Sequence, residues 1–154
     1  MNIRNTLIPT LLFCLLLSVA HAESSAWRSP LAVPGATTVS VAEAKRLHDL
    51  GVSFVDVRNP RLYQRKHIPG AHHLDLKNGF SRDALEALVA PDEPLLLYCS
   101  GVKCSRSSRA AKLAVSWGYQ RVYYFREGVI GWKKAGLLMK FADGSLRPVN
   151  ADGQ

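Results

Sequence analysis

One stretch decides the fold of this 154-residue chain: Leu95-Leu96-Leu97-Tyr98-Cys99-Ser100-Gly101-Val102-Lys103-Cys104. Its first four residues form an unbroken apolar run, which is typical of a strand buried on both faces of a parallel sheet. A loop follows from Cys99 to Cys104, and a helix is predicted to begin near Ser105. Because ligands of open α/β sheets bind beyond the carboxyl ends of the strands, this loop is the first candidate for a functional site.

Strands and helices alternate along the rest of the chain. Ser40 and Glu43 stand at capping-box spacing and predict the start of a helix, and Ser81 is predicted to cap a second helix that ends before Pro91. The remaining helices are predicted over about 60–66, 105–117 and 128–135, and the remaining strands over 52–57, 71–74 and 122–125. This alternation indicates an α/β domain with a mostly parallel sheet.

Residues 1–22 have the pattern of a secretory signal peptide. Arg4 precedes an apolar run over 11–17, and Ala20-His21-Ala22 then places the cleavage site after Ala22. The apolar run is too short for a comfortable membrane anchor, and a lipoprotein signal at Cys14 is the weaker alternative. We therefore expect a periplasmic or secreted protein with no membrane attachment after cleavage.

The rest of the chain is predicted to divide into a leader segment over 23–37, one domain over 38–140 and a loosely ordered tail over 141–154.

The formal charge of +8 falls to +7 on cleavage, because Arg4 is the one charged residue removed. Basic residues are spread along the chain, which argues against nucleic-acid binding and favours attraction of a small anion or plain solubility. No metal site is expected, since His72 and His73 would point to opposite faces of an extended segment.

The loop has the features that activate a cysteine. The first amides of a helix lack internal partners, and the helix dipole adds positive charge beside them. A loop that wraps back onto the helix start, with Gly101 allowing the bend, would surround Cys99 with N–H groups and lower its thiol pKa. Lys103, Arg106 and Arg109 place cations on or near the loop. The competing interpretation is that Cys99 is a buried and inert core cysteine.

Five short motifs, in this order, resemble the signature of a rhodanese domain over about residues 38–138: Asp56-Val57-Arg58, His67-Ile68-Pro69-Gly70-Ala71, Leu97-Tyr98-Cys99, Phe125-Arg126-Glu127-Gly128, and Trp132 with Ala135-Gly136. The resemblance implies a central parallel sheet with helices on both faces. It also implies transfer of a sulfane sulfur from a donor such as thiosulfate to cyanide or a thiol, through a persulfide on Cys99. The anion-binding loop would be formed by Ser100, Gly101, Val102, Lys103, Cys104 and Ser105, with no metal or organic cofactor.

The sequence departs from the common pattern of that family at three positions. Leu62 stands where an acidic residue is usual before Tyr63, which leaves Arg58 without its usual ion-pair partner. Lys66 replaces a glycine before the His67 motif. Cys104 occupies the sixth loop position, where arginine or threonine is common, and the chain thereby resembles an exported subgroup with a Cys-x4-Cys loop.

Cys104 has two interpretations. As a resolving thiol it would attack the Cys99 persulfide, release sulfide and leave a disulfide that an external thiol reductant reopens. As a small neutral residue it would only fill the start of the helix.

Three other functions compete with sulfur transfer. A phosphatase of the Cys-x5-Arg type is disfavoured, because Ser105 stands at the arginine position and Arg106 comes one residue later. A thiol–disulfide exchange protein would use the Cys99/Cys104 pair, although the usual redox motif has two intervening residues rather than four. A sulfur carrier without catalytic activity is the third alternative.

Overall fold

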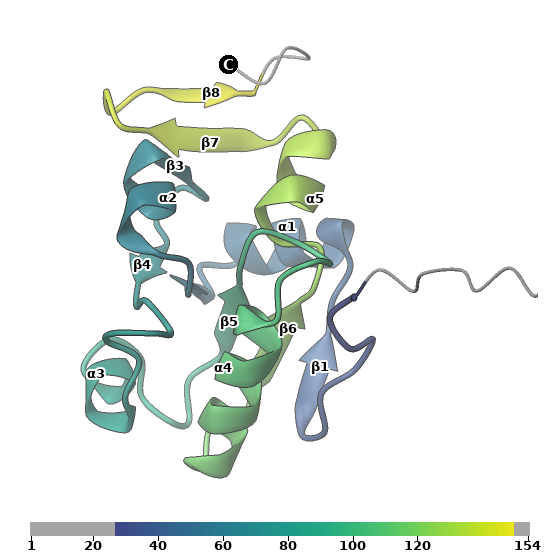
Figure 1. The fold of residues 1–154 in the computed structure, drawn as a ribbon, viewed down its shortest axis with the longest axis vertical. Helices are drawn as coiled ribbons and strands as arrows, with labels where there is room; N and C mark the ends of the chain where they lie inside the picture. The colour runs from purple at the N-terminus through teal and green to yellow at the C-terminus, as the bar shows by residue number, and fades with distance from the viewer. Residues whose placement is uncertain (1–26, 150–154) are drawn as a thin grey trace, which may run out of the picture.

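The computed structural model describes residues 27–149, and its centre is a parallel sheet of five strands in the order β1-β6-β5-β2-β4 (Figure 1). The strands are β1 Ala36–Thr38, β2 Ser53–Asp56, β4 His72–His73, β5 Leu95–Tyr98 and β6 Val122–Phe125. The apolar run 95–98 is the central strand, and all four of its residues are buried. The prediction of a strand covered on both faces is confirmed.

Helices cover the two faces of this sheet, as the α/β prediction requires. They are α1 Val41–Asp49, α2 Pro60–Arg65, α3 Arg82–Glu86, α4 Arg106–Ser116 and α5 Gly128–Lys134. In Figure 1, α4 lies in front of β5 and β6, and α1 lies behind them. Side chains alternate along β5, so that Leu95 and Leu97 pack in one core with residues of α4, whereas Leu96 and Tyr98 pack in a second core with residues of α1 and α5.

The predicted helix starts are formed by serine caps. The Ser40 hydroxyl accepts a hydrogen bond from the amide of Glu43, and the Ser81 hydroxyl accepts one from the amide of Ala84. Each bond satisfies one of the free amides of a first helical turn. The second of these helices ends at Glu86, well before Pro91.

Four strands, β1, β3, β7 and β8, lie outside the strands that the sequence predicts. β1 falls at the end of the segment 23–37, where it pairs with β6. The segment 141–154 was expected to be loosely ordered, but β7 Leu138–Phe141 and β8 Leu146–Pro148 form an antiparallel hairpin that also pairs with β3 Lys66–His67. All residues of β8 are exposed, and the strand is too short to give a periodic signal in the sequence. The hairpin lies beyond α2 and α5, at the opposite end of the molecule from α3 (Figure 1).

The predicted signal peptide and its cleavage site lie outside the described residues. Within residues 27–149, no helix is both long and apolar enough to cross a bilayer.

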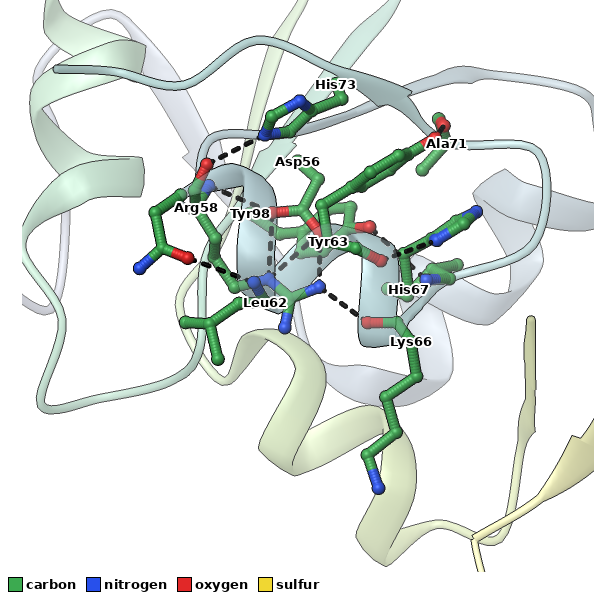
Figure 2. Close-up of polar contacts among 11 residues, drawn as sticks. Asp56, Arg58, Leu62, Tyr63, Lys66, His67, Ala71, His73 and Tyr98 are labelled. Atoms are coloured by element: carbon green, nitrogen blue, oxygen red, sulfur yellow. Dashed lines mark hydrogen bonds and ion pairs between the residues drawn. The ribbon is translucent and has the colours of Figure 1, made fainter. Parts of the chain in front are cut away.

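A buried ion pair joins the end of β2 to β3. The guanidinium of Arg58 binds the carboxylate of Asp56 through Nε at 2.9 Å, and its Nη2 donates to the carbonyl of Lys66 at 2.9 Å. Figure 2 shows this guanidinium between the two acceptors. Both charged side chains are almost wholly buried. The acidic partner of Arg58 is therefore Asp56, two residues before it. It takes the place of the acidic residue that is usual where this chain has Leu62.

Aromatic stacking holds Tyr63 of α2 against His67 and His73. The Tyr63 ring stacks on His67 with ring centroids 4.0 Å apart and on His73 with centroids 4.5 Å apart. The Tyr63 hydroxyl donates to the carbonyl of Ala71, and a ring nitrogen of His73 contacts the carbonyl of Arg58 (Figure 2). These contacts give His67 and His73 structural roles in holding α2 against the edge of the sheet.

We expect Asp56→Asn to destabilise the protein by about 3–5 kcal/mol, because the charge of Arg58 would remain buried without its counter-ion. Urea denaturation measures this change. The control is Glu86→Gln, which removes the exposed pair between Arg82 and Glu86, and for which we expect little or no loss of stability. Equal losses in the two variants would show that burial does not explain the contribution of the Asp56–Arg58 pair to stability.

Candidate active site

The loop that follows β5 is held in place by the first turn of α5. The amide of Val129 donates to the carbonyl of Cys99 at 3.0 Å, and the amide of Ile130 donates to the carbonyl of Ser100 at 2.9 Å. From the other side, the amide of Ser29 donates to the carbonyl of Val102 at 2.7 Å. The path of the loop therefore depends on segments that are remote from it in the sequence.

The first turn of α5 packs so closely against the loop after β5 that position 128 requires glycine. Gly128 has a φ of +52°, and a Cβ placed there would lie 2.1 Å from the carbonyl oxygen of Cys99. That oxygen belongs to the backbone and cannot move away as a flexible side chain could. Gly128 therefore permits the approach of α5 that sets the loop, and it is the last residue of the Phe125-Arg126-Glu127-Gly128 motif.

The variant Gly128→Ala should lose about 3 kcal/mol or more of unfolding free energy, because backbone strain and overpacking add up. Gly136→Ala is the matched control, since Gly136 has a φ of +68° but a Cβ added there would meet no atom within 4 Å. Its loss should be about 1–2 kcal/mol from backbone strain alone. Thermal or urea denaturation separates the two, and an equal loss would contradict close packing at Gly128.

A cavity of about 550 Å³ opens between the loop and α5. Its walls are formed by Ser100, Gly101, Val102, Lys103, Cys104, Glu127, Ile130, Gly131 and Lys134. The loop residues on this wall were all predicted as site residues, whereas the α5 residues were not. Two lysines, Lys103 and Lys134, stand on the cavity wall and favour an anionic ligand, while Glu127 adds one acidic group.

Cys99 does not line this cavity. Its side chain is 0% exposed and packs in the core with Val55, Leu97 and Ala110. The thiol donates to the carbonyl oxygen of Cys104 at 3.3 Å and lies 3.2 Å from the hydroxyl of Ser107. A hydrogen bond with Cys104 and burial together raise the pKa of the Cys99 thiol well above its ordinary value. The sulfur of Cys99 is therefore not exposed on the cavity wall, whereas the sequence predicts an accessible sulfur at this position.

Cys104 has the opposite environment. It is partly exposed and lines the cavity. A hydrogen bond from the Cys99 thiol, assisted by the backbone amides of Arg106 and Ser100 and by the charge of Arg106, lowers the pKa of Cys104 to about 6 despite partial burial. The start of α4 supplies part of this environment, because Ser105 makes no side-chain cap and leaves the first amides free. Amide groups thus converge on a sulfur in this loop, and that sulfur is Cys104.

The two cations predicted to support the site, Arg106 and Arg109, lie in different environments. Arg106 forms an ion pair with Asp75 at 3.1 Å, from Nη1 to Oδ1, and still acts on Cys104 through its charge. Arg109 is exposed and does not line the cavity. Lys134 is the cation that the sequence analysis missed. Its position in the last turn of α5 could have been inferred only by placing α5 beside the loop.

Alkylation of Cys104 by iodoacetamide should rise with pH through a midpoint near pH 6, because the thiolate is the reactive form and the Cys104 pKa is about 6. In Cys99→Ala the hydrogen-bond donor is lost, and the midpoint should move up toward the ordinary thiol value of about 8.5. Cys99→Ser keeps a donor at this position and should shift the midpoint less. A midpoint that stays near pH 6 in Cys99→Ala would contradict the role of this hydrogen bond.

Among residues 27–149, no group of three or more histidine, cysteine, aspartate or glutamate side chains is arranged to hold a metal ion. Both cysteines in this part of the chain are free thiols. One of these thiols, Cys104, lines the cavity, and the other, Cys99, is buried behind it.

Fold and site together define an α/β protein with a two-cysteine loop at the carboxyl edge of a parallel sheet. Comparison with known proteins identifies its family. Residues 40–135, more than half of the chain, match the rhodanese-like domain. The chain belongs to the rhodanese-like domain family.

Relatives agree with this assignment. The chain is 35% identical over 91 residues to thiosulfate sulfurtransferase GlpE of Pseudomonas fluorescens, a match that covers 59% of this chain and 79% of that protein. Its fold resembles the BH2092 protein of Bacillus halodurans, with a TM-score of 0.63, 23% identity and coverage of 71% and 80% of the two chains. It also resembles the human single domain sulfurtransferase TSTD1, with a TM-score of 0.56, 23% identity and coverage of 64% and 96%.

Proposed function

We propose that this protein is a sulfurtransferase that moves a sulfane sulfur from a small anionic donor such as thiosulfate to a thiol or to cyanide. The observation that carries the proposal is a two-cysteine loop whose Cys104 lies partly exposed on the wall of a cavity that also presents two lysines. The similarity to a thiosulfate sulfurtransferase supports the same class of reaction. No metal or organic cofactor is part of the proposed chemistry.

The reaction would proceed through a persulfide. A thiolate of the loop attacks the outer sulfur of thiosulfate, the bond between this sulfur and the sulfonate group breaks, and sulfite leaves with the electron pair. Lys103 and Lys134 attract the donor, whose negative charge grows on the departing sulfite. The acceptor then attacks the outer sulfur of the persulfide and restores the loop thiolate.

Two adjacent thiols permit a second outcome. When one cysteine carries the persulfide, the thiol of the other can attack its inner sulfur, which forms a disulfide and releases hydrosulfide. An external thiol reductant must then reopen the disulfide. Export, which we propose from residues 1–22, would place the pair in the periplasm or outside the cell, where disulfides persist.

The competing functions have less support. Thiol–disulfide exchange as the main activity is not favoured by the similarity to thiosulfate sulfurtransferases of two Pseudomonas species. A phosphatase would need an arginine that closes the loop around phosphate, but Arg106 is engaged by Asp75. The cavity wall contributed by α5 holds lysine rather than arginine.

We expect the purified protein to release sulfite from thiosulfate and to form thiocyanate when cyanide is present. The double variant Cys99→Ser/Cys104→Ser should lose this activity by about 10³-fold or more, because no thiolate remains in the loop. Sulfite and thiocyanate assays measure the two half-reactions. The control variant Lys112→Gln changes an exposed lysine of α4 outside the cavity and should keep its activity. Turnover of an aryl phosphate without turnover of thiosulfate would contradict the proposal.

A further inference from the structure

The fold gathers basic residues at the end of the molecule that carries the β7–β8 hairpin. Residues 59–71, which include α2 and β3, and residues 128–149, which include α5 and the hairpin, together contain seven lysine and arginine residues but one acidic residue. The other described residues contain twelve basic and nine acidic residues. Cations that are spread along the sequence are thus concentrated in space, because β3 pairs with β7 and joins the two segments (Figure 1).

A half-buried phenylalanine lies at the centre of this basic end. The guanidinium carbon of Arg147 is 3.8 Å from the ring centroid of Phe141, and Nζ of Lys66 is 5.4 Å from it. Burial lowers the pKa of Lys66, and the like charges of three neighbouring cations lower it further. These neighbours are Lys133, Arg65 and Arg147. We call Arg65, Lys66, Lys133, Phe141 and Arg147 the basic face.

The basic face has the properties of a surface that binds an anionic macromolecule. Asp143, the single acidic residue of the two segments, pairs with Arg147 at 3.4 Å, so the positive excess remains large. The face draws on α2, β3, α5, β7 and β8, which is more surface than one small anion covers. Arginine and aromatic residues are enriched in protein interfaces, and Leu138 and Leu146 of the same hairpin are exposed.

The position of the basic face beside the cavity indicates the kind of partner. Lys133 is followed in α5 by Lys134, which lines the cavity together with Cys104. A partner on the basic face therefore lies next to the two-cysteine loop. The acceptor in the proposed reaction is a thiol, and a protein can supply both acidic side chains and a cysteine. Lipid headgroups and nucleic acids supply negative charge without a thiol.

Resting on the sulfurtransferase function proposed above, we propose that the basic face is the docking surface for an acidic protein whose cysteine accepts the sulfane sulfur. The partner's thiolate attacks the outer sulfur of the loop persulfide and forms a new sulfur–sulfur bond. The original sulfur–sulfur bond breaks, and its electron pair stays on the loop sulfur as a thiolate. The hairpin that completes the basic face lies outside residues 40–135, which match the rhodanese-like domain.

Peptide thiols of defined charge test this docking surface. The probe is a synthetic peptide with one cysteine between two runs of glutamate, and the matched peptide has glutamine in place of glutamate. With thiosulfate as donor, kcat/KM of the wild type should be about tenfold higher for the glutamate peptide at low salt. The preference should shrink as salt is added, because salt screens exposed charges.

The double variant Arg65→Glu/Lys133→Glu reverses two charges of the basic face and leaves the cavity wall unchanged. It should lower kcat/KM for the glutamate peptide by about tenfold or more. The matched control Arg82→Glu/Lys112→Glu makes the same change of net charge at exposed positions of α3 and α4, and should stay within about twofold of the wild type. Transfer to uncharged 2-mercaptoethanol should be alike in all three proteins. Equal losses for the glutamate peptide in the two double variants would overturn the basic face.

A binding measurement separates docking from sulfur transfer. Fluorescence anisotropy with the glutamate peptide, its cysteine replaced by serine, should show weaker binding to Arg65→Glu/Lys133→Glu than to the control variant. Transfer to 2-mercaptoethanol with no preference for the glutamate peptide would overturn the docking surface and leave the sulfurtransferase function intact. Peptide binding without transfer to any thiol would overturn the sulfurtransferase function, and with it the role of the partner as acceptor. Tighter binding of phosphatidylglycerol vesicles or of an oligonucleotide, lost in Arg65→Glu/Lys133→Glu, would overturn the assignment to a protein.

Discussion

The site depends on one hydrogen-bonded pair, the buried thiol of Cys99 and the partly exposed sulfur of Cys104. Two thiols that lie close together do not both ionise readily, so the proton is expected to stay on the sulfur that is farther from water. A hydrogen bond with Cys104 and then burial raise the pKa of Cys99, whereas the Cys99 thiol and then the amides of Arg106 and Ser100 lower the pKa of Cys104. A single loop therefore contains two thiols whose pKa values are shifted in opposite directions.

This pair exists only because other elements hold the loop. The first turn of α5 binds the carbonyls of Cys99 and Ser100, and Gly128 allows the approach. The same helix contributes Ile130 and Lys134 to the cavity wall. The buried pair of Asp56 and Arg58 serves a similar purpose one strand away, where it fixes the end of β2 that lies beside β5. Rigid elements thus set the geometry of the reactive loop, as precise chemistry requires.

Much of this architecture can be predicted from the sequence, because the signals are local. The apolar run 95–98 and the strand 122–125 have the expected bounds, and Ser40 and Ser81 cap helices as expected. The strands β1 and β8 could not be predicted in this way. Both are short and largely exposed, and backbone pairing alone defines them. The ion-pair partner of Arg58 was also missed, because the family pattern places the acidic partner at the position of Leu62 and not at Asp56.

The environment of each thiol could be inferred only in part. The inward direction of Cys99 follows from its parity with Leu95 and Leu97, a signal that was available in the sequence. The exposure of Cys104 depends on the turn at Gly101 and on α5, whose residues come about thirty positions later in the chain. The free amides at the start of α4 can be expected from the sequence, but nothing local shows which sulfur lies nearer to them.

The most direct test is an NMR pH titration of the reduced wild-type protein labelled at Cβ of cysteine. Both thiols are then followed in one sample, without substitution. We expect the Cβ signal of Cys104 to titrate with a midpoint near pH 6, while Cys99 stays protonated throughout the stable pH range. A titration of Cys99 near pH 6, with Cys104 remaining a thiol, would contradict the central claim.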